Sequence, residues 1–320
     1  CVELNRHVAK NSDDAVNHLR ATLQKLDKRW EELEIGLCGA GTHPFCRKLA
    51  LITPQERYLE IEKTAGYQAH AQITFSTHVH VGLGSGDEAI RAMSFLAPAI
   101  PVFIALSANS PFWRGYETGH VAYRHRILAA ARTYGTPPHF ESWQDFDQFL
   151  RVATRSGMIR NFKDIHWDIR PHPDFGTIEL RVMDAAPDLH TLQGLAAFAR
   201  ALILCFSNAS RPEVATVLPL NLPRWITYQN RYRAGVQGLE APYIVNEKGH
   251  TCCIREIANK LIELCQSTAL ECGESDGLEI VKHMLNSHSL AEHQLNVYHQ
   301  DHSARSVVRD LQSVLTDKLF

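Results

Sequence analysis

The sequence HWDIRPHPDFGTIELRV occupies residues 166–182 and decides how the fold is organised. Both ends of this stretch alternate polar and apolar side chains, the pattern of a strand with one buried face. Its middle is rich in proline and glycine, which is typical of a turn. Asp168 and Arg170 share a face on the first arm, and Glu179 and Arg181 share a face on the second. The stretch therefore predicts an antiparallel hairpin with a charged face.

A second long strand is predicted over residues 70–83, where apolar and polar residues again alternate. Spacing by two on a strand places His78 and His80 side by side on its polar face. Neutral imidazole binds divalent metals and can donate a hydrogen bond to phosphate. For a histidine pair alone, however, two surface residues on a half-exposed sheet are the better interpretation.

Glu179 and Arg181 repeat this arrangement with opposite charges. A carboxylate can hold magnesium, and an arginine beside it can neutralise phosphate. A cross-strand salt bridge on a solvated face is the alternative, and it is favoured for such a pair in isolation. The coincidence of two polar faces, each backed by an apolar one, favours a concave antiparallel sheet suited to magnesium–ATP.

The rest of the chain is mainly helical in pattern. Apolar residues recur every three or four positions over residues 16–33, which predicts an amphipathic helix that Asn11 or Ser12 can cap. The apolar residues 96–106 contain two prolines and predict a buried, kinked helix rather than a membrane span. No repeat or linker is evident, so residues 1–320 are predicted to form one continuous domain. The expected class is α+β, with a curved, mainly antiparallel sheet backed by helices.

Composition limits the partners. The 320-residue chain has 33 basic and 35 acidic residues, for a net charge of −2, so neither nucleic acid nor a membrane surface is an expected partner. Its 8 cysteines include no CxxC pair, which favours reduced thiols and a cytoplasmic location. Small-molecule substrates are expected, and a homodimer is left open.

Five motifs resemble the type 2 glutamate–cysteine ligases and occur in the order of that family. They are GTHPF at 41–45, THVHVG at 77–82, SANSPFW at 107–113, DIRP at 168–171 and FGTIELRVMD at 175–184. The likeness extends over nearly the whole chain and thins past about Glu240. It implies a fold like the catalytic domain of glutamine synthetase. It also implies an ATP- and magnesium-dependent ligase that joins a carboxylate, by default the γ-carboxylate of glutamate, to the amine of cysteine through an acyl phosphate.

The resemblance also assigns roles to individual residues. The magnesium ligands would be Glu3, His78 and Glu179. ATP phosphate would contact His80, and the transferring phosphoryl group would lie between the catalytic arginines Arg170 and Arg181. The substrate-binding residues would be Thr42, His43, Arg124 and Asn230.

The chain departs from the family pattern at three places. No GxExE strand precedes Glu3, so two further carboxylates are expected upstream of Cys1. Ala122 stands where the family usually has serine, and Val236 stands where it has arginine. Three alternatives therefore remain: a ligase for another amino acid or amine, a non-catalytic nucleotide- or ligand-binding relative, and a metalloprotein using the C-terminal histidines. The spacing of those histidines follows no zinc pattern.

Overall fold

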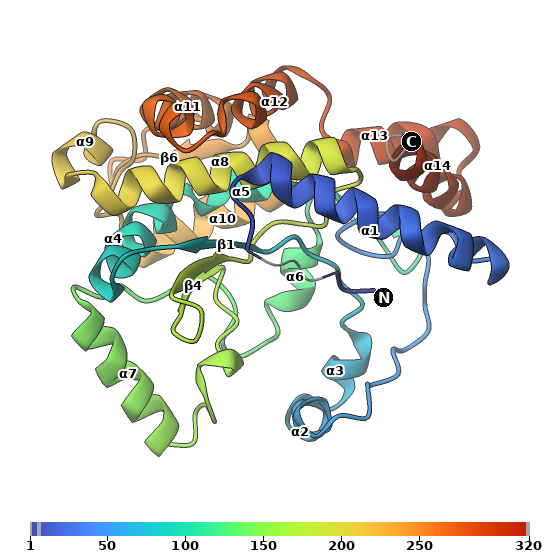
Figure 1. The fold of residues 1–320 in the computed structure, drawn as a ribbon, viewed down its shortest axis with the longest axis horizontal. Helices are drawn as coiled ribbons and strands as arrows, with labels where there is room; N and C mark the ends of the chain where they lie inside the picture. Colours follow the sequence, from blue (N-terminus) through green and yellow to red (C-terminus); the bar gives the residue numbers. More distant parts are fainter. Residues whose placement is uncertain (1, 5–7, 318–320) are drawn as a thin grey trace.

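The computed structural model describes residues 2–4 and 8–317 (Figure 1). The α-helices are α1 (Ser12–Glu32), α2 (Glu56–Ala65), α3 (Tyr67–Ala71), α4 (Gly86–Leu96), α5 (Ile100–Leu106), α6 (Arg124–Leu128), α7 (Trp143–Arg155), α8 (Leu189–Asn208), α9 (Arg211–Ala215), α10 (Arg224–Gln237), α11 (Ile254–Glu271), α12 (Ser275–Asn286), α13 (Leu290–Asp301) and α14 (Ala304–Thr316). The strands are β1 (Val79–Gly82), β2 (Phe112–Trp113), β3 (Tyr116–Glu117), β4 (Ile169–His172), β5 (Thr177–Leu180), β6 (Pro242–Ile244) and β7 (Thr251–Cys253).

Strands β1, β5 and β4 form an antiparallel sheet in that order. Its register places His80 on one side of Glu179 and Arg170 on the other. Ile178 and Leu180, which alternate with the polar residues of β5, are fully buried. The sheet therefore has one apolar face and one charged face, as the alternation predicts.

Helix α8 is the central helix of the molecule (Figure 1). It packs against α1, α4, α11, α12 and strand β1. Its side chains Leu195, Phe198 and Leu202 are fully buried in the main hydrophobic core, which also contains Ile178 and Leu180. Burial of apolar surface is the main favourable term in folding, so this helix anchors the sheet whose other face carries the charges.

The predicted hairpin is confirmed and closes tightly. The backbone N–H of Phe175 donates to the carbonyl of His172 at 3.1 Å. Gly176 has a φ of 62°, in the left-handed region where side-chain-bearing residues are strained. A glycine at this position therefore lets β4 turn directly into β5.

The predicted helix over residues 16–33 is also confirmed as α1, and Asn11 is its cap. The Asn11 side chain accepts a hydrogen bond from the backbone of Asp14 at 2.9 Å. The buried carboxylate of Glu274 accepts bonds from the Ser12 backbone and from Arg200, each at 3.0 Å. These contacts fix the start of α1 to the start of α12.

The long strand predicted over residues 70–83 is wrong in extent. Only Val79–Gly82 forms a strand, and His70 lies in helix α3. Ser76 forms an isolated bridge with Asp184. Alternation marks an extended chain, but a ladder also needs a partner, and β5 offers only four paired positions to β1.

In the part of the chain that the structure describes, two helical segments are long and apolar enough to cross a membrane: residues 86–106, 78% buried, and α8, 61% buried. In this structure the first is α4 and α5 joined by a 3₁₀ turn, as the two prolines predict, and both segments lie in the core.

The described strands form three small antiparallel sheets among the helices. An α+β combination is thus present, while a glutamine synthetase-like architecture stays a prediction.

Candidate active site

Glu179 lies at the centre of the charged sheet face. Its Oε2 accepts a hydrogen bond from Arg170 Nε at 2.8 Å, and its Oε1 accepts one from Arg181 Nη1. His78 Nδ1 and His80 Nε2 each lie 3.5 Å from the same Oε1. The prediction that these five residues share one surface is confirmed, and their catalytic roles stay predictions. We call this group the Glu179 cluster.

The electrostatics of the Glu179 cluster favour an ionised carboxylate beside a neutral imidazole. Burial alone would raise the pKa of Glu179, but the hydrogen bond from His80 and the charges of Arg181 and Arg170 hold it well below its usual range. Burial and the Arg181 guanidinium lower the pKa of His78 to about 3. At neutral pH His78 therefore presents an uncharged ring, the form that binds metals.

The two arginines differ in how fully they are engaged. Besides Glu179, Arg170 donates through Nη1 to the backbone carbonyls of Phe162 and Lys163, both at 3.2 Å, and of Ile165. Arg181 is 19% exposed and bonds to Glu179 through Nη1. Arg170 thus fixes the carboxylate, whereas Arg181 has side-chain surface open to a ligand.

The predicted metal ligands are brought together only in part. Glu179 and His78 are neighbours, while Glu3 is exposed. Within residues 2–4 and 8–317, no three His, Cys, Asp or Glu side chains form a group that could hold a metal ion. Magnesium is often bound by one or two carboxylates with water and substrate phosphates, so Glu179 fits an ion that arrives with a phosphate. The role of Glu3 stays a prediction.

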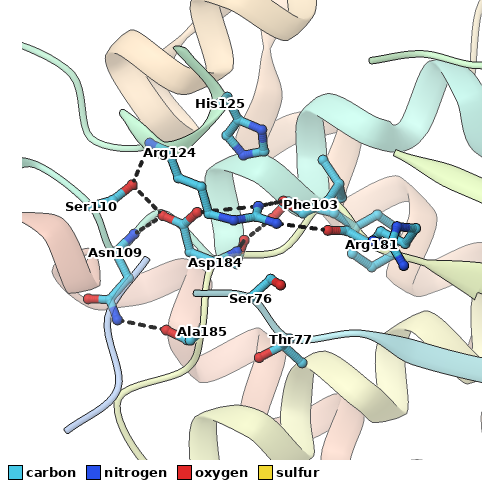
Figure 2. Close-up of polar contacts among 12 residues, drawn as sticks. Ser76, Thr77, Phe103, Asn109, Ser110, Arg124, His125, Arg181, Asp184 and Ala185 are labelled. Atoms are coloured by element: carbon cyan, nitrogen blue, oxygen red, sulfur yellow. Dashed lines mark hydrogen bonds and ion pairs between the residues drawn. The ribbon is translucent and has the colours of Figure 1, made fainter. Parts of the chain in front are cut away.

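Asp184, which ends the FGTIELRVMD motif, organises the loops beside the sheet (Figure 2). Its fully buried Oδ2 accepts hydrogen bonds from the backbone of Asn109 at 3.0 Å and from the hydroxyl of Ser110 at 2.6 Å. A Cβ on Gly41 would lie 2.4 Å from the carboxyl carbon, so only glycine fits there. Burial raises the pKa of Asp184.

Arg124 is buried beside Asp184 (Figure 2). Its Nη1 donates to the carbonyl of Val182 at 3.0 Å and its Nη2 to that of Arg181 at 3.3 Å. Nη1 lies 3.7 Å from Asp184 Oδ1. The buried Nε–H of Arg124 has no hydrogen-bond partner among the described residues. The predicted binding of substrate by Arg124 would therefore rest on that one donor, and it stays a prediction.

Thr42 and His43 lie in the loop that includes Gly41. The buried Thr42 hydroxyl donates to the carbonyl of Phe112 at 2.6 Å, and His43 Nδ1 accepts from the backbone of Cys46 at 3.1 Å. Burial lowers the pKa of His43. Both side chains are thus used to shape the loop, and contact with substrate stays a prediction.

Asn230 is buried in α10 and uses its amide on the backbone of Ile244. It donates to the carbonyl at 2.9 Å and accepts from the N–H at 2.7 Å. This pairing gives Asn230 a structural role, so its predicted contact with substrate gains no support from these contacts. The next residue, Arg231, holds Asp168 through two bonds of 2.7 and 2.9 Å.

Sequence reasoning missed the roles of Asp184, Asp168 and Arg231. Asp168 and Asp184 stand in quoted motifs, but their partners are 63 and 75 residues away along the chain. The available signal was a charged residue on an otherwise apolar stretch, such as Asp184 after Val182 and Met183. Asp168 and Asp184 lie next to the two ends of the hairpin that carries Arg170, Glu179 and Arg181. The two arms also meet there, because Arg181 N–H donates to the Asp168 carbonyl at 2.8 Å.

A family model for glutamate–cysteine ligase family 2 matches residues 1–310. The chain belongs to this family. A relative from Trichormus variabilis is 39% identical over 99% of this chain and 82% of its own length. One from Thermobifida fusca is 30% identical over 96% of this chain and 76% of its own length. Both carry the name "Putative glutamate--cysteine ligase 2".

A solved glutamate–cysteine ligase from Francisella tularensis, in complex with AMP, is a distant structural match to this member of glutamate–cysteine ligase family 2. The match has a TM-score of 0.43 and 11% sequence identity, and it covers 73% of this chain and 60% of the other.

Proposed function

We propose that this protein is an ATP-dependent carboxylate–amine ligase that joins the γ-carboxylate of glutamate to the amine of cysteine. Family membership and the Glu179 cluster support this proposal. The observation that carries it is the meeting of an ionised carboxylate, a partly exposed arginine and two imidazoles on one face of a sheet. Phosphoryl transfer needs such a surface, because its catalysis depends mainly on positioning and on stabilising charge.

In the proposed reaction, a carboxylate oxygen of glutamate attacks the γ-phosphorus of ATP and the bond to ADP breaks. The amine of cysteine then attacks the acyl phosphate, and phosphate leaves with the original carboxylate oxygen. Arg181 and His80 would stabilise charge on the phosphoryl oxygens, and Arg170 would keep Glu179 in position. Magnesium, held by Glu179 and His78 together with the phosphates, would neutralise further charge.

We also propose a cellular compartment and a class of substrate. The described cysteines are all free thiols, which supports a reducing, cytoplasmic compartment. The near-neutral chain supports small-molecule substrates. Cysteine is the default amine, and the closest alternative within the proposal is another amino acid or amine on the same activated carboxylate.

A substrate panel tests the proposal. Purified protein with magnesium–ATP should release ADP only when a carboxylate and an amine are both present, and glutamate with cysteine should give the highest rate. ADP release with a different pair would keep the ligase and replace the substrate. Binding of ATP without ADP release for any pair in a broad panel would instead favour a non-catalytic ligand-binding relative.

Magnesium dependence tests the assigned roles. The variants His78→Ala and Glu179→Ala should regain part of their ADP formation at raised magnesium, since a weakened metal site is filled by mass action. His80→Ala and Arg181→Ala, which remove contacts to the phosphoryl oxygens, should not. Equal rescue of all four variants would overturn the division between metal and phosphate ligands.

A further inference from the structure

Phe175, at the tip of the β4–β5 hairpin, is an aromatic side chain left open to solvent. It is 68% exposed although it stands beside the Glu179 cluster. One face of its ring stacks on His172, with centroids 4.2 Å apart and planes 4° from parallel. A ring that is stacked on one face and exposed to this extent keeps its other face open.

The support beneath this ring is rigid. His172 is buried in β4, and the Phe162 ring packs against it in a T-shaped arrangement with ring centroids 4.7 Å apart. The hairpin turn fixes Phe175 through its hydrogen bond to the His172 carbonyl. Aromatic rings held in this way form a preorganised platform, which reduces the entropy lost when a flat ligand stacks on it.

The platform belongs to the same face as the phosphate-binding candidates. His80 lies near both the platform and the Glu179 carboxylate. Its ring centroid is 5.8 Å from that of Phe175, and its Nε2 is 3.5 Å from Glu179 Oε1. Thr177 and Glu179 in β5, and Arg181 directly after it, then follow on one face, spaced about 7 Å apart by the strand repeat. A flat, apolar surface is thus followed by imidazole and guanidinium groups. A nucleoside triphosphate has a matching order, with a flat base at one end and negatively charged phosphates at the other.

We propose that Phe175 and His172 form the platform on which the base of the nucleotide stacks, with the phosphates directed toward His80 and Arg181. This inference rests on the proposed ATP-dependent function and adds the residue that binds the base. Stacking accepts any flat base, so Phe175 would contribute affinity for a nucleoside triphosphate over inorganic polyphosphate without selecting adenine.

The test compares ATP with inorganic tripolyphosphate, each with magnesium, by calorimetry on wild type and Phe175→Leu. Leucine keeps an apolar side chain but removes the stacking face. ATP should bind about 5- to 150-fold more weakly to Phe175→Leu, the loss expected for one base–aromatic stack, while tripolyphosphate binding is unchanged. Unchanged tripolyphosphate binding also shows that the variant is folded.

Two matched variants sharpen the result. Phe175→Trp retains a stacking face and should keep ATP affinity. Trp225→Leu removes an aromatic side chain that is 64% exposed on α10 and should leave ATP binding unaltered. If wild type binds ATP and Phe175→Leu binds it equally well, the platform is wrong and the ligase proposal stands. If wild type binds no ATP, both the platform and the ATP-dependent ligase proposal are wrong.

Discussion

The Glu179 cluster and the Asp168–Arg231 pair use the same chemistry in different surroundings. Both join a buried carboxylate to arginine, at 2.8 Å in the first and 2.7 Å in the second. Asp168 and Arg231 are both buried, and the ring of Tyr134 packs against the guanidinium at 4.8 Å. The Glu179 cluster instead presents two partly exposed histidines and Arg181 to solvent. Exposure of the partners, rather than the ion pair itself, therefore separates a binding surface from a structural support.

The largest effect should be on stability and should come from breaking the Asp168–Arg231 pair. Asp168→Ala leaves Arg231 buried without its counter-charge, which should lower the free energy of unfolding by about 3–5 kcal/mol. Urea denaturation measures this. The control is Asp147→Ala, which breaks a 2.7 Å pair with Arg151 whose side chains are 42% and 63% exposed, and which should cost about 1 kcal/mol or less. Equal losses of unfolding free energy in the two variants would show that the buried Asp168–Arg231 pair is no more important for stability than an exposed pair.

The next largest effect should be on catalysis and should follow from Arg181→Met. Losing one preorganised donor to the transferring group should slow ADP formation about 10²- to 10³-fold. Arg200→Met is the matched control, because Arg200 is 27% exposed and also pairs with a buried carboxylate, Glu274. It should lose stability while the folded enzyme keeps its rate. A similar fall in rate for both variants would contradict a catalytic role specific to Arg181.

The smallest effect concerns pH, and its sign differs between two carboxylates. The folded pKa of Glu179 is lowered, so its stabilisation is present above the unfolded value of about 4.3 and is lost as pH falls toward the folded value. The folded pKa of Asp184 is raised, so its cost is present at neutral pH and is relieved as pH falls through the folded value toward about 3.9.

Unfolding free energies measured from pH 7 downward should show these opposite trends. Relative to Glu179→Gln, wild type should lose stability on acidification. Relative to Asp184→Asn, it should gain stability. Parallel trends in the two comparisons would mean that the environments of Glu179 and Asp184 do not differ in the way described.

The sequence predicted the charged face because that face depends on local alternation. Period two over residues 166–182 was sufficient to place Arg170 and Glu179 on one surface, and the turn residues located the hairpin. The length of β1 was not predictable in the same way, because its ladder ends where β5 ends. The supports were missed because tertiary contacts decide them: Arg231 reaches Asp168 across 63 residues, and no local pattern links the two.

We propose that the Glu179 cluster promotes the transfer of the γ-phosphoryl group of ATP to the γ-carboxylate of glutamate. Glutamate labelled with ¹⁸O in its γ-carboxylate tests this claim most directly, by mass spectrometry of the phosphate released with ADP in the presence of cysteine. One labelled oxygen should appear in each phosphate formed by wild type, because the acyl phosphate carries that oxygen away when the amine attacks. ADP formation that yields only unlabelled phosphate would show transfer to water and would contradict the account.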